Sequence, residues 1–513
     1  MTAIDRSSTV TGTVAVVGTG TMGQGIAQVA LVAGHPVRLY DAAPGRAAEA
    51  AASIAARLDR LVEKGRLTAA DRDAARDRLR PAAALAELGD AELVVEAVVE
   101  ELAVKQKLFT ELEEFVTDAC LLATNTSSLS VTAVAGALRI PGRFVGLHFF
   151  NPAPLLPLVE VVRGSATEDA AADRACATAA AWGKTPVRCA DTPGFIVNRI
   201  ARPFYAEAFR VYEERSADPA TIDAALRESG GFKMGPFELT DLIGQDVNEA
   251  VTRSVWESFS QDPKFTPSLA QRRLVESGLH GSKSGRGWYD HGPDAAPPAP
   301  HTAEPRTAPR EVTIEGSLGP ADVLRELIEE AGVKVVGEDD PAELASQAGC
   351  VVLPGGARLL LCDGGTASGY ASSGTHIYFD LALDYRAATR IVLAPGDSAA
   401  AADVDEAIGL FQALGKRVSV IDDVPGMIVA RTVAMIADFA LDAVARGVAG
   451  PEDVDIAMRL GVNYPGGPLE WAGRLGATWL EGVLDALHYA YPTGRYGPST
   501  ALRRRASAEE QVL

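Results

Sequence analysis

A long internal repeat constrains the fold of this chain more than any other feature of its sequence. The segment DTPGFIVNR at residues 191–199 returns as DVPGMIVAR at residues 423–431, an offset of 232. The same offset carries Asp223 onto Asp455, and it superposes a Gly-Pro pair and a Gly-Lys pair on their counterparts. A chain of 513 residues is too long for a single core, so these anchors at one constant offset predict a tandem duplication.

The first copy begins with an α/β pattern. The apolar run at residues 14–17 ends in GTGTMG, and a segment of helical periodicity and a second apolar run, VRLYD, follow it. This order of elements is typical of the start of a doubly wound parallel sheet. Residues 45–85 are predicted to form long amphipathic helices, and the pattern is mostly helical again from residue 192 to about residue 275. Further strands are predicted at residues 93–99, 120–125, 143–150 and 158–162.

The loop GTGTMG has the residue types that binding of a dinucleotide pyrophosphate requires. Gly18 permits the tight turn after the strand, and Gly20 lets the backbone approach the phosphates. Gly23 lets the helix pack closely on the sheet. Thr21 and Met22 open this helix, whose N-terminus attracts the phosphate charge.

Asp41, at the end of the second predicted strand, favours NAD over NADP. A carboxylate there accepts hydrogen bonds from the adenosine ribose and repels a 2′-phosphate. Ala42 and Ala43 follow it, so no arginine is at hand to bind such a phosphate. The alternative is a loop that keeps the fold but no longer binds a dinucleotide.

His148 and Glu160 are candidates for acid–base chemistry. His148 lies in the apolar run RFVGLHFF and Glu160 in the run LVEVV, with a Pro-rich turn between them. A glutamate in such a run is costly to bury unless it is paired, and a nearby histidine supplies the partner. The carboxylate then fixes the ring tautomer and favours the imidazolium, as a general base requires. Spacing alone equally allows a strand-edge histidine bonded to backbone and a surface glutamate.

Several motifs, taken in order, resemble those of the 3-hydroxyacyl-CoA dehydrogenase family. They cover about residues 13–290. The second half resembles the same family more faintly, as in long bacterial members with two tandem helical domains, including those of phenylacetate catabolism and 3-hydroxybutyryl-CoA dehydrogenases. The motifs are GTGTMG, NTSSL (125–129), GLHFFNP (146–152), DTPGFIVNR (191–199), MGPFEL (234–239) and GSKSGRGWYD (281–290).

The resemblance implies a role for each matching residue. His148 would remove the 3-hydroxyl proton as hydride leaves C3 for the nicotinamide, and Glu160 would orient it. Ser127 and Asn198 would hydrogen-bond the substrate, although Ser127 could instead cap a helix and Asn198 could be a polar surface residue. Arg57 stands where some relatives have a serine that contacts coenzyme A, which leaves that contact open. The positions that match NAD contacts are Glu100, Lys105, Asn151 and Lys283, and Lys64 matches a lysine that contacts coenzyme A.

The second copy is predicted to be catalytically silent. At the offset of 232, Asp380, Val392 and Ala430 replace the base, its orienting acid and the substrate-contacting asparagine. The equivalent glycine loop, residues 316–321, carries Leu318 where a pyrophosphate would approach. Because the apolar helix faces are retained, we expect the second copy to dock on the first as an internal pseudo-dimer partner, and a homo-oligomer stays open.

The expected fold is an α/β Rossmann-like NAD-binding domain followed by an all-α domain, with a degenerate tandem copy of both. The composition of residues 291–310, rich in Pro and Ala, predicts an extended linker. The predicted parts are the NAD-binding domain (1–189), the first helical domain (190–290), the linker (291–310), the degenerate Rossmann-like copy (311–420) and the second helical domain (421–513).

Charge and composition restrict the partners. A net charge of −20 argues against non-specific nucleic-acid binding, so an anionic acyl-CoA needs a local basic patch, for which Lys64 and its neighbours are the candidates. No apolar run is long enough for a membrane span, and five cysteines without CxxC spacing predict reduced, cytoplasmic thiols and no metal site. Three alternatives stay open: a dicarboxylic substrate such as 3-hydroxyadipyl-CoA, another hydroxy acid, or a non-catalytic NAD-binding scaffold.

Overall fold

The computed structural model describes residues 9–337, 349–369 and 374–510. They form two compact units, which are described separately: Met1–Arg199 with Arg446–Val462, and Ile200–Ala445 with Asn463–Leu513. The first unit therefore includes a segment of the second copy. In the part of the chain that the structure covers, no helix combines the length and apolar character needed to cross a membrane.

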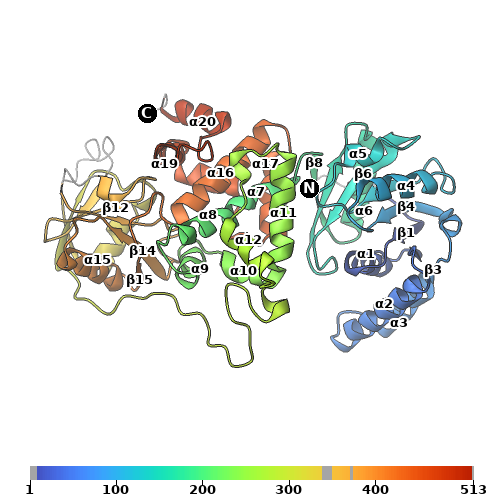
Figure 1. Ribbon diagram of the computed structural model, residues 1–513, viewed down its shortest axis with the longest axis horizontal. Helices are drawn as coiled ribbons and strands as arrows, with labels where there is room; N and C mark the ends of the chain where they lie inside the picture. Colours follow the sequence, from blue (N-terminus) through green and yellow to red (C-terminus); the bar gives the residue numbers. More distant parts are fainter. Residues whose placement is uncertain (1–8, 338–348, 370–373, 511–513) are drawn as a thin grey trace. The chain divides into compact units, whose positions relative to one another are not determined.

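An eight-stranded sheet in the order β3-β2-β1-β4-β5-β6-β7-β8 forms the first unit (Figure 1). All neighbouring strands are parallel except β6 and β7, which are antiparallel. This is the doubly wound sheet that the sequence predicts. Its strands are β1 (Thr13–Val17), β2 (Val37–Tyr40), β3 (Leu79–Pro81), β4 (Ala91–Glu96), β5 (Leu121–Thr124), β6 (Phe144–Phe149), β7 (Leu158–Arg163) and β8 (Thr185–Ala190).

Helices cover this sheet. Four of them, α1, α2, α3 and α6, share one buried apolar cluster with the strands, to which Ile26, Ile54, Ala75 and Ala172 belong. The prediction of helix throughout residues 45–85 is wrong at its end, because Leu79–Pro81 pair with β2 as an edge strand, where a proline is tolerated. The helices are α1 (Thr21–Val32), α2 (Arg46–Glu63), α3 (Ala69–Arg78), α4 (Leu102–Leu112), α5 (Val131–Ala135), α6 (Asp169–Ala181), α7 (Val197–Ile200) and, from the second copy, α17 (Pro451–Gly461).

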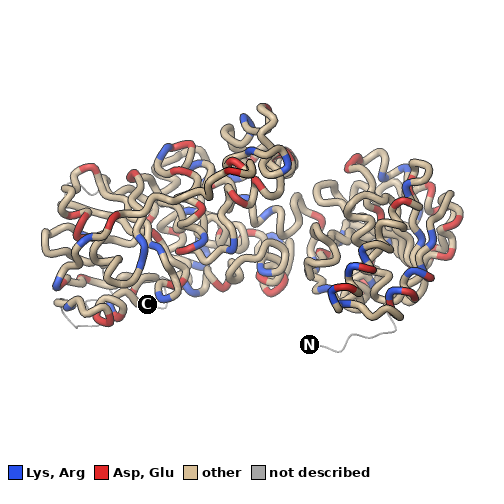
Figure 2. The backbone as a smooth tube through the Cα atoms, turned by 90° about the horizontal axis from the view of Figure 1, so that it is seen from below, with Lys and Arg blue, Asp and Glu red and all other residues tan. Residues whose placement is uncertain are grey.

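Helices of both copies form much of the second unit. Helix α8 packs against α16, so elements of the two copies are in direct contact there, with a buried ion pair between Arg431 and Glu207 (Figure 1). Basic and acidic residues are interspersed along the backbone of both units (Figure 2). The helices are α8 (Arg202–Glu213), α9 (Pro219–Glu228), α10 (Pro236–Ile243), α11 (Gln245–Ser258), α12 (Leu269–Glu276), α16 (Val429–Ala445), α18 (Pro468–Leu475), α19 (Ala477–Ala490) and α20 (Thr500–Glu510).

A seven-stranded sheet in the order β10-β9-β11-β12-β13-β14-β15 completes the second unit. Here β11 is antiparallel to both its neighbours, whereas the corresponding β4 is parallel to its own. The reversal follows from the short turn between β11 and β12, because only antiparallel strands can be joined without a long crossover. The strands are β9 (Glu311–Glu315), β10 (Lys334–Val336), β11 (Cys350–Val352), β12 (Arg358–Leu361), β13 (His376–Phe379), β14 (Arg390–Pro395) and β15 (Arg417–Val420), and helices α13 (Leu324–Glu330) and α15 (Ala401–Ala413) flank the sheet.

Each sheet is completed by a segment of the other copy. On the first sheet, the edge strand β8 donates a hydrogen bond from Ala190 N to Val448 O at 2.8 Å, and α17 packs on β7 and β8. The equivalent bond on the second sheet runs from Asp422 N to Ser216 O at 3.1 Å, and α9 packs on β14. Both residues of each pair differ from their counterparts by 232, so the two copies exchange equivalent segments.

The linker is extended, and its second half is anchored on helix α9 and on the second sheet. His301 N donates to Thr221 Oγ1 at 2.8 Å, and Ala303 N donates to Val418 O at 2.8 Å. The strand β9 begins immediately after residue 310. These hydrogen bonds fix the backbone of a Pro-rich segment that forms neither a helix nor a strand.

Candidate active site

His148 and Glu160 face each other across the antiparallel pair β6 and β7, where the register places them directly opposite. The distance from His148 Nδ1 to Glu160 Oε2 is 2.6 Å. His148 is 5% exposed and Glu160 is fully buried, with an exposed fraction of 0%. The structure therefore supports the buried, paired arrangement over the strand-edge histidine and surface glutamate.

The second oxygen of Glu160 binds the start of α7. Its Oε1 accepts hydrogen bonds from Ile196 N at 3.0 Å and Val197 N at 2.9 Å. Gly194 and Phe195 have φ values of 74° and 49°, and this left-handed turn precedes the two N–H groups. Gly426 and Met427 repeat this conformation in the second copy, with φ values of 74° and 48°, so the turn belongs to the fold of both copies. The fully bonded carboxylate fixes the backbone that carries Asn198, a half-buried residue.

This geometry defines what the imidazole can do. With Nδ1 donating to the carboxylate, Nε2 is left as the proton acceptor. The rings of Phe150 and Phe195 lie 4.5 and 5.7 Å from the imidazole ring, between centroids, and shield it from water. The buried carboxylate stabilises the imidazolium that forms when Nε2 takes a proton.

Ser127 lies in the loop after β5, and Glu100 holds this loop. Glu100 Oε1 accepts hydrogen bonds from Ser127 N and Ser128 N, each at 3.1 Å. Burial acts to raise the pKa of Glu100, but the Lys105 ammonium and the loop hydroxyls lower it overall. Ser130 is the N-cap of α5, so Ser127 does not cap that helix.

Sequence reasoning missed a buried carboxylate, Glu96, at the end of β4. Lys105 Nζ lies 2.6 Å from Glu96 Oε1 and 3.1 Å from Glu100 Oε2, and the lysine is 1% exposed. The sequence contains a pattern that predicts a buried, paired glutamate here, because Glu96 ends the apolar run LVVE just as Glu160 interrupts the run LVEVV. The Lys105 ammonium is engaged by these two carboxylates, and its contact with NAD stays a prediction.

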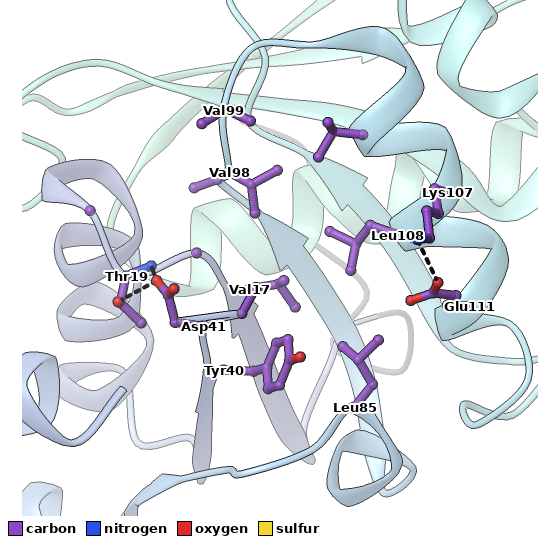
Figure 3. Close-up of a pocket in the computed structure, with 15 residues that line it drawn as sticks. Val17, Thr19, Tyr40, Asp41, Leu85, Val98, Val99, Lys107, Leu108 and Glu111 are labelled. Carbon is purple, nitrogen blue, oxygen red and sulfur yellow. Dashed lines mark hydrogen bonds and ion pairs between the residues drawn. The ribbon is translucent and has the colours of Figure 1, made fainter. Parts of the chain in front are cut away.

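A pocket of about 580 Å³ opens at the carboxyl ends of β1, β2 and β4 (Figure 3). It is lined by the glycine loop and Asp41, together with the apolar side chains of Tyr40, Leu85 and Leu108. Asp41 Oδ2 accepts hydrogen bonds from Thr19 N at 2.9 Å and Thr19 Oγ1 at 2.6 Å (Figure 3). Burial acts to raise the pKa of Asp41, but the bonds from Thr19 and the backbone lower it, so the carboxylate is charged.

The glycines of the loop meet the requirements of a dinucleotide. A Cβ built on Gly20 would meet no atom within 4 Å, so the space in front of it is open to a pyrophosphate. A Cβ on Gly23 would lie 1.8 Å from Gly18 O, which shows how closely the helix approaches the strand. The pocket therefore fits the adenosine and pyrophosphate of NAD, and the helix opened by Thr21 and Met22 begins at its edge.

The predicted coenzyme A patch lies at the end of α2. Lys64 is exposed at the C-cap of this helix. Arg57 donates a hydrogen bond to Gln24 on α1, and burial together with the neighbouring Arg60 lowers the pKa of Arg57. Asn151 is exposed just beyond β6.

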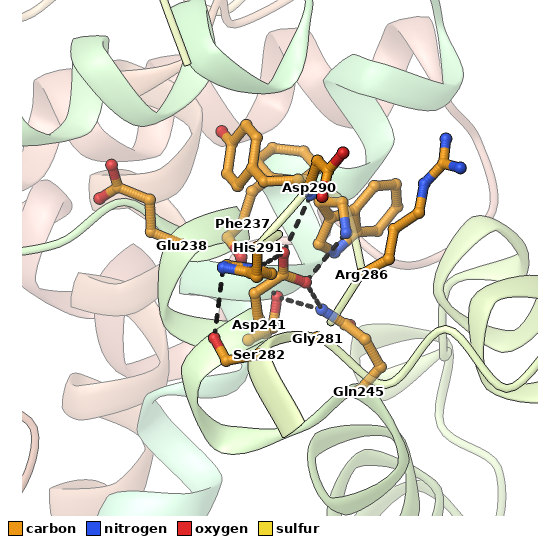
Figure 4. A network of polar contacts seen from close by, with 12 residues as sticks. Phe237, Glu238, Asp241, Gln245, Gly281, Ser282, Arg286, Asp290 and His291 are labelled. Carbon is orange, nitrogen blue, oxygen red and sulfur yellow. Dashed lines mark hydrogen bonds and ion pairs between the residues drawn. The ribbon is translucent and has the colours of Figure 1, made fainter. Parts of the chain in front are cut away.

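The closing motif GSKSGRGWYD lies in the other unit, where the buried carboxylate of Asp241 organises it (Figure 4). Asp241 accepts hydrogen bonds from Trp288 N at 2.9 Å, Tyr289 N at 3.0 Å and His291 Nε2 at 2.8 Å. Within the same unit, Lys283 Nζ is 2.6 Å from Asp246 Oδ1, so a contact of Lys283 with the cofactor stays a prediction.

The second copy replaces the pair of His148 and Glu160 with one structural carboxylate. Asp380, at the position of His148, accepts hydrogen bonds from Ile428 N at 3.0 Å, Val429 N at 2.8 Å and Ala430 N at 3.0 Å. It thus takes over the anchoring of the helix start that Glu160 performs in the first copy. Leu318 is buried in the core of its domain, so that turn is packed rather than open to a ligand.

Comparison with known proteins identifies the family. The chain is 44% identical over 502 residues to the 3-hydroxyadipyl-CoA dehydrogenase of Escherichia coli K12, covering 97% of this chain and 98% of that protein. The chain belongs to the 3-hydroxyacyl-CoA dehydrogenase family. It is therefore an NAD-dependent oxidoreductase, as its resemblance, fold and glycine loop predict.

Family models account for both copies of this dehydrogenase. Residues 13–192 match the NAD-binding domain of 3-hydroxyacyl-CoA dehydrogenase, and residues 194–291 and 426–511 each match its C-terminal domain. Residues 359–425 match the reduced Rossmann-fold domain of 3-hydroxybutyryl-CoA dehydrogenase. These matches confirm the duplication and its shortened second sheet.

Solved structures agree with this assignment. The crystal structure of a 3-hydroxybutyryl-CoA dehydrogenase from E. coli K12 covers 98% of this chain and 100% of its own, at 42% identity and a TM-score of 0.88. A 3-hydroxybutyryl-CoA dehydrogenase from Ralstonia eutropha matches 55% of this chain and 99% of its own, with 38% identity and a TM-score of 0.53. The first relative thus shares the tandem architecture, and the second corresponds in length to one copy.

Proposed function

We propose that the first copy oxidises an L-3-hydroxyacyl-CoA reversibly to the 3-oxoacyl-CoA, with NAD as cofactor and His148 as general base. The observation that carries this proposal is the buried pair of His148 and Glu160, on the same sheet as the dinucleotide pocket. A histidine held through Nδ1 by a carboxylate presents Nε2 in the form that accepts a proton.

The reaction step follows from this pair. NAD, when bound, supplies the acceptor for the hydride that leaves C3 of the substrate. His148 Nε2 takes the proton of the 3-hydroxyl group, and Glu160 stabilises the imidazolium that results. Ser127 and Asn198 hydrogen-bond the substrate oxygens. In the reverse direction, the imidazolium returns its proton to the oxygen at C3.

Further contacts rest on the family resemblance. Lys64, on the basic end of α2, binds a phosphate of coenzyme A, and Glu100 acts through the loop of Ser127, which it holds. The residues assigned to the cofactor besides the glycine loop and Asp41 are Glu100, Lys105, Asn151 and Lys283.

A dicarboxylic 3-hydroxyacyl-CoA is the proposed substrate within this class. The support is the relative named 3-hydroxyadipyl-CoA dehydrogenase, which matches nearly the whole chain. By the family resemblance, such a substrate belongs to the degradation of aromatic acids such as phenylacetate. The test is the ratio of kcat/KM for 3-hydroxyadipyl-CoA to kcat/KM for 3-hydroxybutyryl-CoA, and a ratio below one would favour the short monocarboxylic substrate.

The second copy acts, in this proposal, as an internal dimer partner without an active site of its own. The support is the packing of α8 on α16 and the exchange of equivalent segments between the two sheets. A chain ended within residues 291–310 leaves β8 without its cover, and we expect it to lose activity or to form dimers. A first copy that is soluble, monomeric and fully active would contradict this role.

A cytoplasmic location is also part of the proposal. The five cysteines are free thiols in the structure, as expected in a reducing compartment. Association of whole chains into a homo-oligomer is compatible with an internal pair. Light scattering of the purified chain measures its mass and decides between a monomer and a homo-oligomer.

The deciding experiment compares full-length chains in the reduction of acetoacetyl-CoA by NADH. His148→Ala should lose at least ~100-fold in kcat, the scale of a positioned general base, with NADH binding unchanged. His376→Ala is the matched control, because His376 is a histidine of similar burial in strand β13 of the second copy. Full activity of His148→Ala, or an equal loss in both variants, would refute the proposed base.

A further inference from the structure

The segment 446–462 of the second copy contacts the strands that carry the catalytic pair. Its helix α17 packs on β7, which contains Glu160, and on β8. Arg188 N on β8 donates to Asp453 Oδ2 at 3.2 Å, and Ala190 N donates to Val448 O. The segment therefore belongs to the same compact unit as the base and its orienting acid.

Gly461, the last residue of α17, makes the closest approach. A Cβ built there would lie 2.7 Å from Leu158 Cδ2 and 3.0 Å from Val197 Cγ2. The backbone of Gly461 is not left-handed, so any residue could adopt its conformation, and glycine is needed only for the contact. Leu158 and Val197 are both buried, and the β-branched side chain of Val197 has little freedom to move away.

These two neighbours are connected directly to Glu160. Leu158 is two residues before Glu160 on β7 and shares its face of the strand. Val197 N donates to Glu160 Oε1 at 2.9 Å, and Val197 immediately precedes Asn198. A shift of either neighbour would displace the carboxylate from His148.

The silent copy provides an internal comparison. At the offset of 232, Ser229 corresponds to Gly461 and Arg390 corresponds to Leu158. Ser229 Oγ donates to Arg390 O at 2.7 Å, so the same helix end meets the same strand with a side chain in between. In the described residues, this helix end contacts the strand in both copies. On the second sheet the contacting helix residue, Ser229, has a side chain. On the first sheet, which carries His148 and Glu160, the helix residue is Gly461 and has none.

We propose that Gly461 of the second copy is a positioning residue for the first active site, holding Val197 and Leu158 so that Glu160 orients His148. The second copy is thus part of the catalytic centre and not only a scaffold. This inference rests on the proposed roles of His148 and Glu160.

The test is Gly461→Ala in the full chain, with kcat and KM for acetoacetyl-CoA and NADH measured across pH. We expect kcat to fall about tenfold, since small misplacements of reacting groups are costly. KM for NADH should be unchanged, because Gly461 does not line the dinucleotide pocket. The alkaline limb of the kcat profile should move to lower pH, because reduction needs the imidazolium as proton donor and a displaced Glu160 stabilises it less.

Two further variants make the outcome decisive. Gly450→Ala is the matched control, because Gly450 lies at the start of the same helix, has a φ of −68° and would present its Cβ to open space. Leu158→Ala in the Gly461→Ala background removes Leu158 Cδ2, the atom nearest the new Cβ at 2.7 Å, and it should restore kcat and the alkaline limb towards the values of Leu158→Ala alone.

Normal kcat in Gly461→Ala overturns the inference, and so does a loss of kcat without a shifted alkaline limb or without rescue by Leu158→Ala. Failure of the proposed function is distinguished by His148→Ala. If His148→Ala keeps its activity, the proposed role of His148 as general base is wrong, independently of the result for Gly461→Ala.

Discussion

Replacing Glu160 by glutamine perturbs the catalytic pair with the smallest change in shape. Glu160→Gln keeps an acceptor for Ile196 N and Val197 N, but it places an amide where the carboxylate oxygen lies 2.6 Å from His148 Nδ1. A hydrogen bond to a charged group contributes about 1.5–3 kcal/mol. Since about 1.4 kcal/mol corresponds to a factor of ten in rate, kcat should fall roughly 10- to 150-fold.

The assay is the steady-state reduction of acetoacetyl-CoA by NADH, with NADH affinity measured separately by fluorescence titration. Affinity should be unchanged, because Glu160 does not line the dinucleotide pocket. In this direction the imidazolium is the proton donor, and a neutral amide does not stabilise it as the carboxylate does. A kcat within about twofold of the wild type, or a loss that appears equally in NADH binding, would refute the reasoning.

Three other predictions concern positions outside the pair. Gly20→Val should keep the wild-type Tm but weaken NADH binding at least ~100-fold, because its Cβ meets only the space for the pyrophosphate; normal binding by titration would contradict this. Gly23→Ala should instead lower Tm strongly, because its Cβ would lie 1.8 Å from Gly18 O, and an unchanged melting curve would be evidence against that packing. Asp241→Asn should lower the free energy of unfolding by about 1–3 kcal/mol in a denaturant titration, because it weakens the hydrogen bonds that organise the closing motif; a variant as stable as the wild type would exclude that role.

Several features were predictable because they depend on local pattern. The glycine loop requires a particular backbone at particular positions, and Gly18 and Gly20 have the space and conformation expected of them. The pairing of His148 with Glu160 could be inferred because a glutamate in an apolar run needs a partner. The same argument applied to Glu96, at the end of β4, and would have found its bond to Lys105.

By itself, the sequence determined the duplication and the doubly wound first sheet, and it predicts that the second copy is catalytically silent, since each depends on residue identity at fixed spacing. Only the tertiary structure decided that residues 446–462 cover the first sheet, that Gly461 touches Val197, and that Asp380 anchors the helix start in place of Glu160. The physical reason is sequence separation. Val197 and Gly461 are brought together by the packing of whole helices and strands, and such contacts leave no periodic pattern in the residues that form them.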